Sequence, residues 1–214
     1  MKCCKEITLA TVVISYIVFF IGWTLRVICI DLSGLNEYLS WIISFLIHLA
    51  WWPLFAFILI RKYSDKLNIS LKEMVTTSPR MIILLSFILF ALIYNIVGKY
   101  INDSGYGTKM KLYDLIVTAV TVGFFEESIF RGWFLNSLST FVSECKANLI
   151  SSAMFVLIHY PGWLFAGYNL ITILVTSIFV YMLSLIFGWM FKKNRSIWCG
   201  AISHSIWDLI TWVL

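Results

Sequence analysis

Seven stretches of this chain are apolar and long enough to cross a lipid bilayer, which takes about 17 to 25 residues in a helix. They cover approximately residues 7–30, 41–60, 81–97, 112–142, 147–166, 168–191 and 197–214. Of the 214 residues, 61% are hydrophobic and only 13% are charged, and the mean hydropathy is +0.90. Soluble domains do not have such a composition. The sequence therefore predicts an all-α, polytopic transmembrane helical bundle of about seven or eight spans.

The chain has no internal repeat, low-complexity segment or linker that would separate two domains. We therefore expect residues 1–214 to form a single transmembrane domain. The acidic residues inside the predicted spans are Asp114, Glu126, Glu127 and Asp208, all in the C-terminal half. Residues 112–214 are thus the half expected to carry the chemistry.

The distribution of Lys and Arg predicts the orientation. With a cytoplasmic N-terminus, eleven of these residues fall on the inside and three, Lys99, Lys109 and Lys111, on the outside. This positive-inside bias predicts a multi-pass protein of the cell membrane with its N-terminus in the cytoplasm. The net charge of +5 suits contact with an anionic lipid bilayer, and the lack of a clustered basic face argues against nucleic acid.

Residues 61–80 mix charged residues with regularly spaced apolar ones. This pattern favours a short helix lying on the cytoplasmic surface of the membrane.

Three ionisable residues, Glu126, Glu127 and Arg131, lie close together within a predicted span. Charged side chains inside a membrane are costly unless they face the bundle interior and find partners. Glu127 and Arg131 are spaced i, i+4, so we expect them to form an ion pair on one helical face. Glu126 is rotated by about 100° on the helix and needs a different partner.

Two of the three histidines extend this pattern. His159 lies in the next predicted span, and His204 precedes Asp208 by one helical turn in the last one. A rise of about 1.5 Å per residue places Glu126, His159 and His204 roughly 24, 20 and 14 Å along their helices. We therefore expect the three to meet inside the bilayer. His48 has no acidic residue one turn away and is expected to serve packing.

Carboxylates and imidazoles that converge from three helices have two chemical uses. They can bind a divalent metal whose bound water becomes a nucleophile near neutral pH. Alternatively, a glutamate acts as general base on water while an imidazole stabilises the oxyanion. Both uses lead to hydrolysis.

Three motifs carry a family resemblance, and they occur in the order Glu126-Glu127-x-x-x-Arg131, Phe155-x-x-x-His159 and His204-x-x-x-Asp208. Together they resemble the motifs of the CPBP family, which includes the type II CAAX prenyl endopeptidases and the bacteriocin-processing or Abi proteins. The resemblance covers approximately residues 112–214. It implies an intramembrane endopeptidase of about eight spans, with a cavity open to the cytoplasm and a membrane-associated peptide or protein as substrate.

The resemblance also implies roles for the motif residues. Glu126 is the base or a metal ligand, and His159 and His204 are metal ligands or catalytic imidazoles. Glu127 and Arg131 form a positioning pair. The motifs do not decide between a metal-dependent and a glutamate-type protease.

Asp208 departs from the family pattern, in which this position is commonly Asn. An ionised carboxylate accepts hydrogen bonds only, so it cannot donate to an oxyanion as an amide does. It can instead bind a metal, or orient His204 and raise its basicity. This departure favours a divalent metal, for which we predict zinc, with four ligands: Glu126, His159, His204 and Asp208.

Two other functions are compatible with the sequence. One is a membrane immunity protein or maturation partner that keeps the motifs without turnover. The other is a proton-coupled transporter, although such proteins often contain inverted repeats and this chain shows none. The sequence does not identify the substrate, say whether it is prenylated, or indicate the oligomeric state.

Overall fold

The computed structural model describes residues 6–102 and 121–213, and helices account for most of them. Helices α1 (Leu9–Leu32), α5 (Met81–Asn102) and α11 (Leu170–Asn194) are uninterrupted, whereas α2 (Glu37–Leu49) continues into α3 (Phe55–Tyr63) through the π-helix η1 (Ala50–Leu54). In the described part, four helical segments are long and apolar enough to span a membrane: Leu9–Ile30, Glu37–Lys66, Met81–Ile101 and Leu170–Asn194. The predicted all-helical membrane bundle is thus confirmed.

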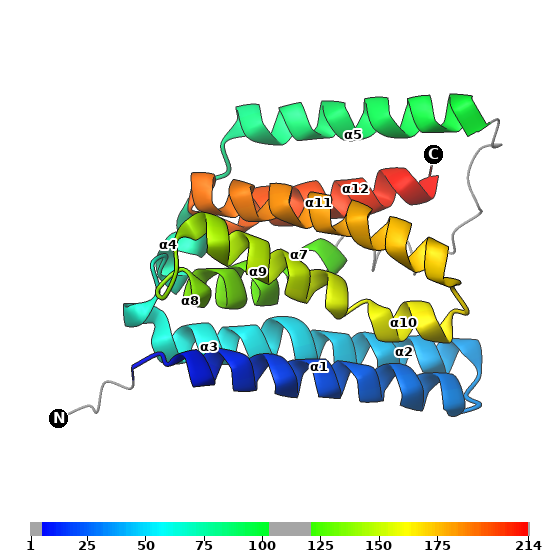
Figure 1. Ribbon diagram of the computed structural model, residues 1–214, viewed down its shortest axis with the longest axis horizontal. Coiled ribbons are helices and arrows are strands. Elements are labelled where there is room, and N and C mark those ends of the chain that lie inside the picture. The colour runs from blue at the N-terminus through cyan, green and yellow to red at the C-terminus, as the bar shows by residue number, and fades with distance from the viewer. Residues whose placement is uncertain (1–5, 103–120, 214) are drawn as a thin grey trace.

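Shorter helices occupy the centre of the bundle. One continuous helical segment consists of α7 (Gly123–Glu127), the π-helix η4 (Ser128–Leu135) and α8 (Asn136–Leu138). It is followed in the chain by three more central helices, α9 (Glu144–Leu157), α10 (Tyr160–Phe165) and α12 (Ile197–Val213). Helix α12 packs against α7, α5 and α11, and η4 packs against α3 and α9. Figure 1 shows this central group between α1 to α3 at one edge and α5 at the opposite edge.

The predicted spans differ from the structure in the C-terminal half. Residues 112–120 lie outside the described residues, and the rest of that span is the α7–η4–α8 segment. The predicted span 147–166 is divided into α9 and α10. Pro161 explains the division, because proline has no backbone N–H to donate to the preceding helical turn but is tolerated in the first turn of a new helix. Helix α12 has 17 residues, the lower limit for a spanning helix.

Pro53 lies within η1. Proline has no backbone N–H to donate to the preceding turn, and a π turn is one of the ways in which a helix changes its hydrogen-bond register. The neighbouring tryptophans attach this segment to α1. The indole Nε1 of Trp51 donates to the carbonyl of Phe19 at 2.9 Å, and the Trp52 ring contacts the Phe19 ring edge to face.

Residues 61–80 form the 3-10 helix η2 (Ser64–Lys66) and the short helix α4 (Leu71–Thr76). The segment is more than a surface helix, because Ile69 and Met74 are fully buried. Asn136 at the start of α8 fixes it in place, donating to the carbonyl of Ile69 at 2.7 Å and accepting from its N–H at 3.1 Å. The segment therefore closes one end of the bundle. Its cytoplasmic location stays a prediction.

The interior contains two apolar clusters. The larger one joins α1, the α2–α3 segment, η4 and α9 through aromatic side chains such as Phe19, Trp52 and Phe130. The second lies between α5, α11 and α12. Large apolar side chains also cover the outside, as at Ile82 and Ile171, which are 73% and 74% exposed. An apolar exterior of this kind is expected where helices face lipid.

Candidate active site

The predicted catalytic carboxylates lie on the α7–η4–α8 segment, in which every residue from Phe125 to Leu138 is buried. The central part of this segment is a π-helix. Single π turns inside helices occur frequently at functional sites. This segment holds Glu126, Glu127 and Arg131 in the middle of the bundle.

Glu127 and Arg131 form the expected ion pair. The Nε atom of Arg131 lies 3.1 Å from Oε2 of Glu127, and both side chains are only 1% exposed. The Nη2 atom of Arg131 donates to both the carbonyl and the hydroxyl of Ser184 in α11, each at 2.9 Å. The guanidinium also lies over the rings of Phe155 and Phe187. Arg131 therefore neutralises a buried carboxylate and ties η4 to α11.

The other oxygen of Glu127 holds His204. Oε1 accepts a hydrogen bond from Nδ1 of His204 at 3.1 Å. The Nε2 atom, on the other side of the ring, therefore faces away from Glu127. Asp208 was one candidate for orienting this ring, but Glu127 makes that contact. A methyl group at Gly200 would lie 2.9 Å from Oε2 of Glu127. The glycine therefore lets α12 approach closely enough for His204 to reach the glutamate.

The Nε2 atom of His204 faces two further carboxylates. It lies 3.8 Å from Oε2 of Glu126 and 3.8 Å from Oδ2 of Asp208. Both distances are too long for direct hydrogen bonds, but a water molecule between such groups can contact more than one of them. Glu126 and Asp208 thus converge on Nε2 of His204, which places two proton acceptors beside one imidazole.

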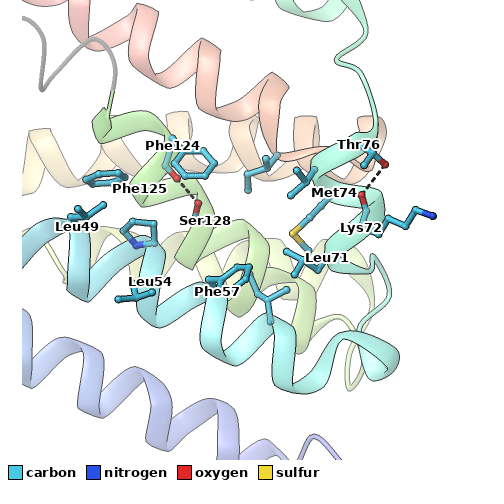
Figure 2. A pocket seen from close by; sticks show the side chains of 14 residues that line it. Leu49, Leu54, Phe57, Leu71, Lys72, Met74, Thr76, Phe124, Phe125 and Ser128 are labelled. Atoms are coloured by element: carbon cyan, nitrogen blue, oxygen red, sulfur yellow. Dashed lines mark hydrogen bonds between the residues drawn. The ribbon is translucent and has the colours of Figure 1, made fainter.

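Chain neighbours of Glu126 line an apolar cavity of about 620 Å³, although Glu126 itself is not one of the lining residues. The Glu126 side chain is 11% exposed, and the neighbours that line the cavity are Phe125 and Ser128. The remaining lining residues are Leu49, Pro53, Leu54, Phe57, Ile60, Leu71, Lys72, Met74, Val75, Thr76, Phe124 and Ile197. Figure 2 shows these side chains approaching from α2 to α3, from α4 and from α7. We call this space the apolar cavity.

His159 follows α9 and is the N-cap residue of α10. Its Nδ1 atom lies 2.7 Å from the carbonyl oxygen of Phe155. The Phe155 ring contacts the rings of both His159 and His204, with centroid distances of 4.8 and 5.9 Å. His159 thus lies near His204 across one aromatic side chain. It also lines a second cavity together with Trp163.

The family comparison agrees with these motifs. Residues 108–210 match the family model described as type II CAAX prenyl endopeptidase Rce1-like. We refer to this matched segment as the Rce1-like domain. No curated protein and no solved structure matched the chain. The family predicted from the three motifs is therefore confirmed.

The Rce1-like domain contains all six predicted site residues, whereas α1 to α5 lie outside the matched range. The family indicates a CAAX-type intramembrane endopeptidase in general. Together with the long apolar helices, it indicates an integral membrane protein with a membrane-associated substrate. The orientation of the chain and the division of labour among the six residues stay predictions.

The predicted metal ligands do not fit a metal ion in this arrangement. Within residues 6–102 and 121–213, no group of three or more His, Cys, Asp or Glu side chains is placed to hold one. Nδ1 of His204 contacts Glu127 and Nδ1 of His159 contacts the carbonyl of Phe155, so only Nε2 of each ring is left for a metal. Zinc therefore stays a prediction, and the steps proposed below use only side chains of the Rce1-like domain.

Three positions of the Rce1-like domain that support the site were missed in the sequence. Ser184 binds Arg131, Phe187 stacks on the His204 ring at 4.8 Å, and Gly200 makes room for Glu127. Each looks unremarkable in an apolar helix, and only the packing of α11 and α12 on η4 gives them a role. Asp114, the other acidic residue of the predicted spans in this half, lies outside the described residues.

Proposed function

We propose that this chain hydrolyses a peptide bond of a membrane-associated, CAAX-type substrate, with Glu126 as the base that activates water. One observation carries the proposal. Glu126, together with Asp208, faces Nε2 of a histidine that is held in place from its other side, and the chain neighbours of Glu126 line the apolar cavity. Base and imidazole therefore lie together, and the base lies on a segment that borders the proposed substrate space.

The contacts of the two adjacent glutamates support the choice of Glu126. Glu127 is engaged by Arg131 on one oxygen and by His204 on the other, and it is completely buried. A carboxylate held in this way is a poor proton acceptor for water. Glu126 lies 3.8 Å from Nε2 of His204 and retains some exposure, so it is the carboxylate that can receive a proton.

The reaction follows from these positions. Glu126 takes a proton from water as the water oxygen attacks the scissile carbonyl carbon. The resulting oxyanion accepts a hydrogen bond from Nε2–H of His204, which is protonated at this stage and is oriented by Glu127. The proton held by Glu126 then passes to the departing amine nitrogen as the C–N bond breaks. The products are a carboxylic acid and an amine.

The apolar cavity gives the substrate its chemical class. Its volume of about 620 Å³ falls within the usual range for ligand pockets, and most of its lining side chains are aliphatic or aromatic. The name of the matched family refers to prenylated substrates. We propose that the cavity takes the prenyl group, or another apolar group, of the substrate next to the scissile bond.

The test compares purified wild-type protein with Glu126→Gln, using a quenched fluorescent peptide that ends in prenyl-cysteine, two aliphatic residues and a terminal residue. Gln keeps the shape of Glu but cannot accept the proton, so we expect cleavage to be lost while thermal stability is unchanged. Glu144→Gln removes a carboxylate that is 65% exposed and serves as the matched control. Turnover near the wild-type level in Glu126→Gln would overturn the assignment.

If the wild-type protein binds but never cleaves such peptides, the endopeptidase proposal fails. A role as a maturation or immunity partner without turnover then takes its place. Binding measured by fluorescence anisotropy of the same peptide separates this outcome from a substrate that is simply not recognised.

A further inference from the structure

The ring of Phe187, in α11, lies flat against the imidazole of His204. The two ring centres are 4.8 Å apart and the ring planes differ by 21°, and Phe187 is 1% exposed. Such a distance and angle are typical of an offset-stacked aromatic pair. Phe155 contacts the same imidazole edge to face, at 69°. Phe187 is thus the stacked partner of a motif histidine, although it belongs to none of the three motifs.

The hydrogen bond to Glu127 does not by itself fix the His204 ring. It holds Nδ1 at 3.1 Å from Oε1 of Glu127, but one hydrogen bond leaves the ring able to turn about the line that joins these two atoms. The χ2 torsion of histidine has broad minima, so such turning costs little. A flat ring packed against the imidazole removes this freedom. Hydrogen bond and stacked ring together therefore determine the direction of Nε2, which lies 3.8 Å from both Glu126 and Asp208.

Two further contacts fix the Phe187 ring itself. Phe87 of α5 contacts it with the ring centres 5.5 Å apart, and the guanidinium of Arg131 lies 5.8 Å from its centre. Phe87 also contacts Trp207 of α12 at 6.2 Å, where α5 packs along α12 (Figure 1). The aromatic contacts of α5, a helix outside the matched range of residues 108–210, thus extend to His204 through Phe187.

A packing role and a role in directing His204 depend on different properties of this side chain. A packing role depends on volume, because another apolar side chain of similar size fills the same space. A role in directing the imidazole depends on a flat face, which Leu and Met lack. A misplacement of about 1 Å at a reacting group can lower the rate about 100-fold. Loss of the flat face should therefore affect the chemical step.

Resting on the proposed function, we infer that Phe187 is a positioning residue of the peptidase reaction. Its ring fixes the plane of the His204 imidazole, so that Nε2–H meets the oxyanion without first reorienting. Helix α5 thereby supports the site from outside the matched segment.

The first measurement reads the contact by NMR of the purified protein in detergent, with isotope-labelled histidine. The chain has three histidines, and His204→Gln identifies the signals of His204. A stacked aromatic ring shields the imidazole C–H protons, so Phe187→Leu should move these signals downfield, whereas Phe187→Tyr keeps the ring and should leave them near the wild-type position.

Phe191→Leu is the matched control. Phe191 is also 1% exposed and lies one turn further along α11. Among the described residues, the rings that contact His204 are those of Phe155 and Phe187, so this variant should leave the His204 signals unchanged.

The second measurement uses the prenyl-cysteine peptide of the cleavage assay. Phe187→Leu and Phe187→Met should lower kcat by about 10- to 100-fold. KM should change little, because Phe187 does not line the apolar cavity. Phe187→Tyr should recover most of the wild-type kcat, and Phe191→Leu should retain it.

The inference is refuted if the His204 signals stay in place in Phe187→Leu, or if a folded Leu or Met variant of Phe187 keeps the wild-type kcat. Equal losses of kcat in Phe187→Tyr and Phe187→Met, or in Phe191→Leu and Phe187→Leu, refute it as well. If thermal unfolding shows that neither Phe187→Leu nor Phe187→Met folds, Phe187 serves packing and the inference fails. If the signals move in Phe187→Leu and stay in Phe187→Tyr while the wild-type protein cleaves nothing, Phe187 still directs the His204 ring and the endopeptidase proposal fails.

Discussion

Replacing Arg131 by Met should destabilise the bundle strongly, because it leaves the carboxylate of Glu127 buried without its cation. Both side chains of this pair are 1% exposed and 3.1 Å apart. Removing one partner of a buried ion pair costs about 3 to 5 kcal/mol, and Met fills much of the vacated volume, so the loss reports on charge more than on packing. For a chain of this length, about 2 to 4 °C per kcal/mol gives a decrease in Tm of roughly 6 to 20 °C.

The double variant Glu127→Gln with Arg131→Met isolates the cause. It leaves no charge unpaired, and the Gln oxygen can still accept from Nδ1 of His204. We therefore expect it to be more stable than Arg131→Met alone, with a coupling of about 1 to 3 kcal/mol. Thermal unfolding in detergent, followed by tryptophan fluorescence, measures all variants.

A matched control comes from the bundle surface. Lys192 and Glu144 form a pair of nearly the same length, 3.0 Å, in which the Lys192 side chain is 9% and the Glu144 side chain 65% exposed. Because this carboxylate is solvated, Glu144→Gln should cost only about 1 kcal/mol. The reasoning is refuted if Arg131→Met unfolds at the wild-type temperature, or if the double variant is no more stable than the single one.

Two further predictions concern charge. The hydrogen bond from Arg195 lowers the pKa of Glu73 below its ordinary value near 4.5. This pair therefore stabilises the fold above that pH and ceases to do so as the pH falls through the folded pKa. Glu73→Gln should cost at most about 1 kcal/mol at neutral pH, and a difference that persists at the same size near pH 3 would contradict the reasoning. If a metal is bound, Asp208→Asn should weaken metal affinity or activity by about 10- to 100-fold, measured by metal analysis and by titration with zinc. In a metal-free enzyme, it should leave activity equal or higher.

Local helical geometry explains why part of the site could be predicted from the sequence. The i, i+4 spacing of Glu127 and Arg131 fixes their contact wherever the helix lies, and the offset of one residue turns Glu126 elsewhere. The contact between His204 and Glu127 depends on how α12 packs against α7. This packing cannot be predicted from the spacing of residues along the chain. For the same reason, the sequence did not indicate that Glu127 contacts Nδ1 of His204.

The break between α9 and α10 had a signal that the hydropathy pattern concealed. Pro161 and Gly162 follow His159 directly, and both residues disfavour a continuous helix. An apolar run of sufficient length nevertheless predicts a single span. The break matters for function, because it places His159 at the start of a separate short helix, where it lines the second cavity together with Trp163.

The balance of charge in the buried cluster explains why Asp208 is the position that separates the two mechanisms. Within residues 6–102 and 121–213, three carboxylates, those of Glu126, Glu127 and Asp208, lie around His204, and one permanent cation, Arg131, is paired with them. Buried charge of this kind must be compensated. Either one divalent cation or two protons, one of them on His204, supply the missing positive charge. Asp208→Asn removes one negative charge, so a single proton then suffices, whereas a divalent cation would leave an excess of positive charge. A metal enzyme should therefore lose affinity for its ion in this variant, and a metal-free enzyme should keep its activity.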